Sequence, residues 1–106
     1  MAKYFFHGTY TSEGVRGVLK EGGSSRKAVV ESAVKGLGGK LEAFYFGLGG
    51  RDTYAIVDFP DNISSTALSL AFNSTGNNSA TMTVFMSPEE MDEAVKKQVT
   101  YRASGQ

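Results

Sequence analysis

Two residues stand out for chemistry, the single histidine and one acid inside an apolar run. His7 lies in an aromatic segment, and because imidazole titrates near neutrality it can serve as a general base or proton relay. Asp58 follows an apolar stretch, residues 55–57, and carboxylates are seldom buried without a partner. We name His7 and Asp58 as candidate catalytic residues. The structural alternatives are a hydrogen-bonded strand histidine and a strand-end acid that reaches solvent or a lysine.

Three further residues are candidate ligand contacts. Asp52 closes the glycine-rich segment from Gly47, where its carboxylate either meets a ligand or accepts hydrogen bonds from nearby backbone amides that hold the turn. Tyr45 and Tyr54 flank that segment. Each could donate a proton or line an aromatic pocket, although aromatic residues more often pack in cores and interfaces.

The sequence carries no motif that specifies a metal or an organic cofactor, and we predict neither. With no cysteine, thiolate metal sites, iron–sulfur clusters and thiol nucleophiles are excluded. One histidine and scattered carboxylates give no metal-ligand spacing. The glycines at 47, 49 and 50 form no dinucleotide fingerprint, because a strand is expected after them where a helix is needed. Eleven basic and eleven acidic residues cancel without a Lys/Arg block, which argues against a nucleic-acid partner.

Length and hydropathy indicate one domain over residues 1–106. No apolar run approaches the roughly 18 residues that a membrane span needs. The aromatic residues after Lys3 form too short a run for the core of a signal peptide. We therefore expect a cytoplasmic protein with no membrane contact.

Hydrophobic periodicity, together with the turn and capping residues between the periodic segments, predicts four strands and four helices. The strands are expected at 3–10, 40–47, 53–59 and 80–86. The helices are expected at 13–20, from a Ser24 or Ser25 cap to 37, from an Asn62 cap to the turn at 73–78, and from 88 to about 98, with a frayed tail at 100–106. Alternation in the second strand predicts Leu41, Ala43 and Tyr45 on one face and Glu42, Phe44 and Phe46 on the other. The third helix is expected to bury Ile63, Thr66, Ala67, Leu70 and Ala71.

The order β-α-β-β-α-β predicts an α+β, ferredoxin-like fold with an extra C-terminal helix. Right-handed crossovers place both main helices on one face of a four-stranded antiparallel sheet. The first two strands carry bulky side chains on both faces, whereas a sheet with one solvated face alternates apolar and polar residues. The open face therefore needs an apolar cover, and we predict a homodimer through it.

An ordered set of residues also links the chain to a known family. The set comprises Tyr10, Thr11, Gly14, Arg16, Arg26, Gly38 to Leu41, Phe44, Tyr45, Gly49 to Asp52, Pro60, Asp61, Gly76, Thr81 and Thr83. With it, the sequence resembles the GYD-domain family. The resemblance implies a ferredoxin-like fold that pairs as a dimeric α/β-barrel, and it brings no established activity. The family's namesake loop reads Gly-x-Tyr-Asp, whereas this chain has Arg51 at the tyrosine position.

Three functions remain open at this point. The first is a non-catalytic homodimer that binds a small molecule or a protein partner. The second is a cofactor-independent enzyme, monooxygenase- or isomerase-like, which requires His7 and Asp58 to line one enclosed cavity. The third is a structural subunit of an assembly larger than a dimer.

Overall fold

The structure, a computed structural model, describes residues 2–106; Met1, which the predicted domain includes, lies outside this description. The elements are β1 (Ala2–Tyr10), α1 (Ser12–Glu21), α2 (Gly23–Gly36), β2 (Lys40–Phe46), β3 (Thr53–Phe59), α3 (Asn62–Ser74), β4 (Asn78–Val84) and α4 (Pro88–Lys96). All neighbouring strands are antiparallel, in the order β2-β3-β1-β4. The predicted ferredoxin-like fold and its extra C-terminal helix are confirmed. The fourth strand begins two residues earlier than predicted.

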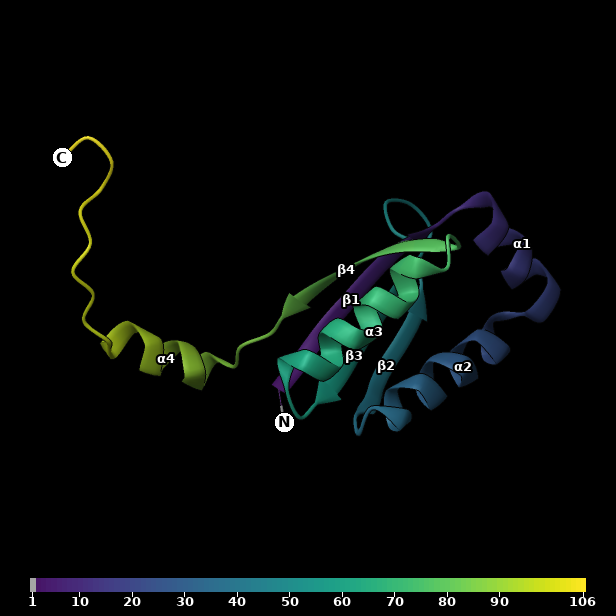
Figure 1. Cartoon of the computed structure of the whole chain (residues 1–106), viewed down its shortest axis with the longest axis horizontal. Coiled ribbons are helices and arrows are strands. Elements are labelled where there is room, and N and C mark those ends of the chain that lie inside the picture. Colours follow the sequence, from purple (N-terminus) through teal and green to yellow (C-terminus); the bar gives the residue numbers. More distant parts are fainter. Residues whose placement is uncertain (1) are drawn as a thin grey trace.

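The core lies between one face of the sheet and the helices α2 and α3 (Figure 1). Alternate residues of the two central strands point into it, because side chains alternate across a strand. These buried strand residues are Tyr4 and Phe6 from β1 and Ala55, Val57 and Phe59 from β3. The helices contribute Val30, Val34 and Leu68. The opposite, open face of the sheet is not covered by any helix among residues 2–106.

Two predicted helix caps are corrected by the structure. Asp61 caps α3, since its carboxylate accepts a hydrogen bond from the Ser64 amide at 2.7 Å. Asn62, the predicted cap, instead accepts a hydrogen bond from the phenol of the buried Tyr4. The cap of α2 is Gly22, whose φ of +83° favours glycine, and it makes no side-chain cap hydrogen bond, so neither Ser24 nor Ser25 caps this helix.

The buried face of α3 also differs from the prediction. Ser65 and Leu68 are buried and Phe72 packs edge-on against Phe6, with 5.8 Å between ring centroids. Ile63 and Leu70, which were expected inside, are 81% and 66% exposed. Helix α3 is apolar on two sides, so its periodicity fits either orientation. The aromatic contact with β1 is made only when the Leu68 side faces the sheet.

A β-bulge in β2 overturns the predicted alternation of that strand. Leu41 pairs with Val57, but the next pair is Ala43 with Ile56, which leaves Glu42 as an extra residue. Beyond the bulge the faces are exchanged. Leu41 and Phe44 therefore both face the core, and Ala43 and Tyr45 lie on the open face.

The C-terminal helix stands apart from the rest of the molecule (Figure 1). Helix α4 begins at Pro88, as predicted, with a capping box in which Ser87 and Glu90 exchange side-chain and backbone hydrogen bonds, and it ends at Lys96. None of its residues is buried. Residues 85–106 therefore form an arm that projects from the end of β4.

Candidate functional site

The open face of the sheet carries a cluster of stacked aromatic rings. Phe5 is its centre, with ring centroids 5.1 Å from His7, 6.1 Å from Tyr54 and 5.4 Å from Phe85. The cluster spans β1, β3 and the residue that follows β4. Aromatic rings of this area are costly to leave in water, so this surface is suited to binding an apolar partner.

An ion network lies on the same face, beside Phe5 and toward the start of β1. The ammonium of Lys3 is 2.6 Å from a carboxylate oxygen of Glu42 and 3.0 Å from one of Asp58. Both hydrogen bonds raise the pKa of Lys3 above its ordinary value, and the bond to Glu42 has the larger effect. The bulge in β2 and the register of β1 with β3 bring the three charges together.

The two candidate catalytic residues share the open face but do not meet. His7 pairs with Tyr54 in the sheet and Asp58 pairs with Lys3, so the two residues are four positions apart along the strands. That offset corresponds to about 13 Å. His7 stacks on Phe5, and the carboxylate of Asp58 is bound to Lys3. Their catalytic assignment stays a prediction, and this single chain does not place them in one cavity.

Of the three candidate ligand contacts, Asp52 holds the 47–52 loop in place, whereas Tyr45 and Tyr54 lie on the open face of the sheet. Asp52 accepts a hydrogen bond from the Tyr10 amide at 2.8 Å, and its own amide donates to Gly8 at 2.9 Å. Its carboxylate thus ties the 47–52 loop to the end of β1. Tyr45 and Tyr54 face each other across β2 and β3 on the open face, where Tyr45 is largely exposed.

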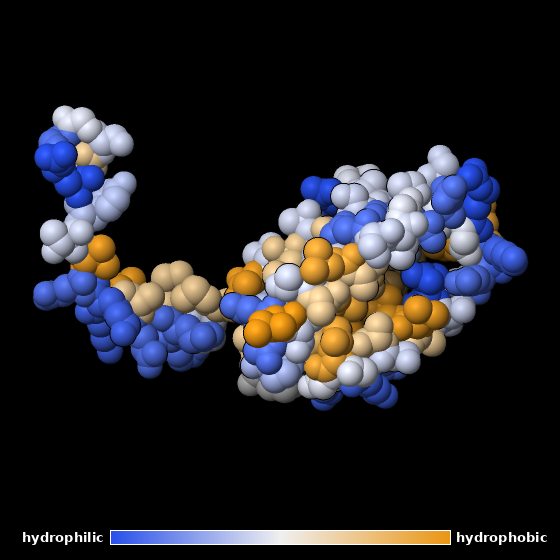
Figure 2. Space-filling model, viewed as in Figure 1, coloured by the Kyte–Doolittle hydropathy of each residue, from blue (hydrophilic) through white to orange (hydrophobic). Residues whose placement is uncertain are grey.

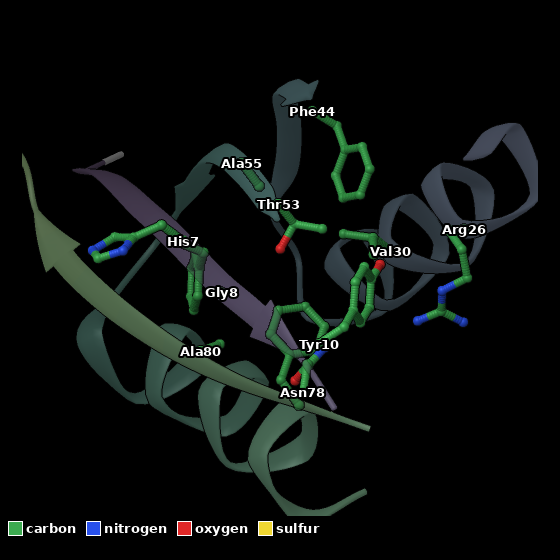
Figure 3. Close-up of a pocket in the computed structure, with 12 residues that line it drawn as sticks. His7, Gly8, Tyr10, Arg26, Val30, Phe44, Thr53, Ala55, Asn78 and Ala80 are labelled. Atoms are coloured by element: carbon green, nitrogen blue, oxygen red, sulfur yellow. The ribbon is translucent and has the colours of Figure 1, made fainter. Parts of the chain in front are cut away.

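A pocket lies on the other side of the sheet, beneath α2 and α3 (Figure 3). Its walls are mostly apolar and come from all four strands and both helices. They include Phe6, Phe44, Ala55, Ala80, Val30 and Phe72. His7 borders the pocket, but Figure 3 shows its imidazole directed away from the other side chains. The enclosed volume is about 30 Å³, room for about two water molecules.

Three polar side chains converge at the mouth of this pocket. The Oδ1 atom of Asn78 is buried and has no hydrogen-bond partner within residues 2–106. Burial raises the pKa of the Tyr10 phenol, the nearby Asp52 carboxylate acts in the same direction, and the Arg26 guanidinium opposes them. Arg26 is only loosely paired, 3.7 Å from a carboxylate oxygen of Glu21. A buried acceptor and a guanidinium are therefore both available to a bound molecule.

A groove between α2 and α3 continues from the pocket to the surface. It shares Arg26, Val30, Phe72 and Asn78 with the pocket and adds about 280 Å³. The groove exists because α2 packs mainly on β2 while α3 packs on β4, so the two helices stand over opposite edges of the sheet. An apolar groove with a few polar groups at one end is typical of small-molecule sites.

Sequence reasoning did not identify Tyr10, Arg26 or Asn78 as site residues. Tyr10 and Arg26 belong to the residues that carry the family resemblance, which was the one available signal for them. No signal in the sequence pointed to Asn78, because its importance depends on burial beneath α3.

The model of the family described as GYD domain matches residues 4–95. The chain belongs to the GYD domain family. The match includes β2, β3, β4 and all of β1 except its first two residues, together with the pocket and most of α4. In this GYD domain, Arg51 of the namesake loop lies with a guanidinium nitrogen 3.4 Å from the Thr9 hydroxyl. No curated protein and no solved structure matches the chain.

Within residues 2–106, no three histidine, cysteine, aspartate or glutamate side chains are grouped to hold a metal ion. None of the helices in that range has the length and apolar character to cross a membrane.

Proposed function

We propose that this GYD domain is a homodimeric binding module that pairs through the open face of its sheet. The observation that carries the proposal is the Phe5 cluster, an aromatic surface on a face that no helix of the described chain covers. Burial of apolar surface is worth about 25 cal/mol per Å². A second copy offers an identical apolar surface, as a two-fold interface requires.

Substitution at the centre of the cluster tests the dimer. We expect light scattering to give twice the 11.3 kDa chain mass for the native protein and the single chain mass for Phe5→Asp. Leu48→Asp is the matched control, because Leu48 is fully exposed in the 47–52 loop. Circular dichroism checks that both variants are folded. A native protein that is monomeric at micromolar concentration contradicts the proposal, and a mass above the dimer supports the assembly alternative.

We further propose that the groove between α2 and α3 binds a small molecule with an apolar body, an anionic group and a hydrogen-bond donor. The anionic group is recognised by Arg26, whose only ion pair in the described chain is long. The donor satisfies Asn78 Oδ1, which is buried and has no hydrogen-bond partner among residues 2–106. The apolar walls take the body of the molecule.

A thermal-shift experiment tests the proposed binding groove between α2 and α3. We expect 4-hydroxybenzoate to raise the melting temperature of the native protein by mass action, and benzyl alcohol at the same concentration to have a much smaller effect. Arg26→Met is expected to abolish the difference, whereas Lys27→Met, its exposed neighbour on α2, retains it. Equal shifts from both compounds, or none from either at saturation, contradict the anion-binding groove.

A cytoplasmic setting belongs to the same proposal, since a chain without cysteine needs no oxidising compartment. The enzyme alternative requires His7 and Asp58 in one cavity, and no observation on the single chain favours it over binding.

A further inference from the structure

The floor of the pocket beneath α2 and α3 is a row of short side chains that crosses three strands. Gly8 of β1 pairs with Thr53 of β3 on one side and with Ala80 of β4 on the other. Residues that pair directly across antiparallel strands point to the same face of a sheet. All three residues line the pocket (Figure 3), and we call this set the small row.

Larger side chains border the small row in both directions along the strands. Phe6 and Met82 form the row on one side, and Tyr10 and Asn78 form the row on the other. Because a strand rises about 3.4 Å per residue, each of these rows lies about 7 Å from the small row. The small row is therefore the place where the covered face of the sheet lacks side-chain bulk, and it lies next to the polar residues at the mouth of the pocket.

The conformation of the backbone does not require the glycine in this row. Gly8 is buried within β1, and its φ does not lie in the positive region that favours glycine. A Cβ at Gly8 would lie 3.1 Å from the Ser79 carbonyl oxygen and 3.3 Å from Thr53 Oγ1. These contacts are tight, but a rotation of the threonine side chain and a small shift of β4 admit alanine. Glycine at position 8 is thus explained better by the space above it than by the backbone.

Large apolar side chains surround the hollow above the small row without filling it. Phe6, Phe44, Phe72 and Val30 contribute to its walls, and a volume of about 30 Å³ remains. An empty apolar hollow costs folding stability, because the atoms of its walls lose dispersion contacts. A bound group that fills the hollow restores those contacts. A volume that holds about two water molecules suits a branch of one or two heavy atoms.

The groove between α2 and α3 determines what can reach the hollow. Figure 2 shows hydrophobic side chains gathered between these helices, where the groove opens. Its volume of about 280 Å³ is close to the lower end of the range for small-molecule sites, about 300 Å³, so it suits a single ring. Arg26 and Asn78 border both the groove and the pocket. A ring acid held by these two residues lies in the groove, and a branch beside its donor reaches toward the small row.

We propose that the small row selects a single-ring aromatic acid that carries a methyl-sized branch next to its hydrogen-bond donor. The branch fills the hollow above Gly8, while the acid meets Arg26 and the donor meets Asn78. This inference rests on the proposed binding groove between α2 and α3. It deepens that proposal, because it names the class of ligand and assigns Gly8 and Ala80 as specificity-determining residues.

Ring acids that differ only in the branch test the small row. The probes are 4-hydroxybenzoate, its 3-methyl derivative and its 3-tert-butyl derivative, and calorimetric titration of the full-length protein gives their dissociation constants. We expect the methyl derivative to bind about four-fold more tightly than 4-hydroxybenzoate, as the burial of one methyl group allows. The tert-butyl derivative should bind several-fold more weakly than 4-hydroxybenzoate. An open groove without a closed hollow gives the opposite order, because the larger branch buries more apolar area.

Substitutions that fill the hollow complete the test. Gly8→Ala and Ala80→Val add bulk from two neighbouring strands, and each should lower the preference for the methyl derivative over 4-hydroxybenzoate to about one or less. Ser79→Val is the matched control, because residue 79 is exposed and lies on the other face of β4, and it should keep the native preference. Circular dichroism checks that the variants are folded.

The outcomes separate this inference from the proposed function. Tightest binding of the tert-butyl derivative by the native protein overturns the selection by the small row and leaves the anion-binding groove intact. An unchanged methyl preference in folded Ala80→Val has the same meaning. A native protein that binds none of the three probes overturns both proposals.

Discussion

At the residue scale, the clearest relation between sequence and structure is at Asp58. An acid at the end of an apolar strand was expected either to face a cavity or to reach solvent or a lysine, and its carboxylate binds Lys3. The sequence could not name that partner, because Lys3 is 55 positions away and only the register of β1 with β3 brings it near. The same applies to Asn78, because distant elements bury its side-chain oxygen, which has no hydrogen-bond partner in the part of the chain that the structure describes.

Asp61 allows a prediction on acid stability. The Ser64 amide that donates to its carboxylate lowers the pKa of Asp61 below the ordinary 3.8. A carboxyl group whose pKa is lower in the folded state stabilises the protein above its unfolded pKa, and this contribution is lost as the pH falls through the folded pKa. We therefore expect Asp61→Asn, which keeps a capping oxygen, to lose less melting temperature than the native protein between pH 6 and pH 2.5.

The control for this experiment is Asp92→Asn on α4, which removes a carboxylate that caps no helix. Its acid sensitivity should match that of the native protein. If Asp61→Asn and Asp92→Asn respond alike, the cap is not the source of the effect.

At the element scale, local signals predicted most of the fold. The bounds of β3, the extent of α1 and the start of α4 all depend on residues that are neighbours in the chain. The errors arose where a distant contact decides between local alternatives. The bulge at Glu42 and the buried side of α3 are such cases, because both depend on packing against β1 or β3.

The two glycines of α1 differ in the space available for a side chain, and this difference leads to a second prediction. A Cβ at Gly14 would lie 2.1 Å from the Asn77 carbonyl oxygen, whereas a Cβ at Gly17 would meet nothing within 4 Å. Gly17→Ala should therefore stabilise the protein by up to about 1 kcal/mol through helix propensity. Gly14→Ala should destabilise it by about 2 kcal/mol, because α1 must move away from the turn before β4.

Urea unfolding of the two variants measures both effects, and each variant serves as the control for the other. Stabilisation by both substitutions would mean that α1 does not contact the turn at Asn77 closely.

At the scale of the whole molecule, three of the apolar surfaces that residues 2–106 expose bear on assembly. These are the aromatic cluster on the sheet, the outer face of α3 around Ile63 and Leu70, and the side of the arm that carries Met91 and Val95. The sequence predicted the first, because bulky residues on both faces of a strand are visible in the order of residues. It did not predict the other two, since a helical stripe is indistinguishable in sequence from a core-facing one.

Dimerisation leads to a third prediction, on thermal stability. If folding is coupled to association, the melting temperature depends on protein concentration. We expect the midpoint of the native protein to rise over a hundred-fold increase in concentration, and that of Phe5→Asp to stay constant. Scanning calorimetry at several concentrations measures it, and a constant midpoint for the native protein would speak against coupled association.

The bulge in β2 has a consequence for how the length of this strand can vary. Glu42 is one residue more than regular pairing requires, and its neighbours Leu41 and Ala43 already face opposite sides of the sheet. A chain lacking residue 42 would therefore keep every remaining side chain of β2 on its present side, and Lys3 would rely on Asp58 alone. Homologous chains that differ by one residue inside this edge strand are expected to differ at this position, where a deletion shifts no other contact.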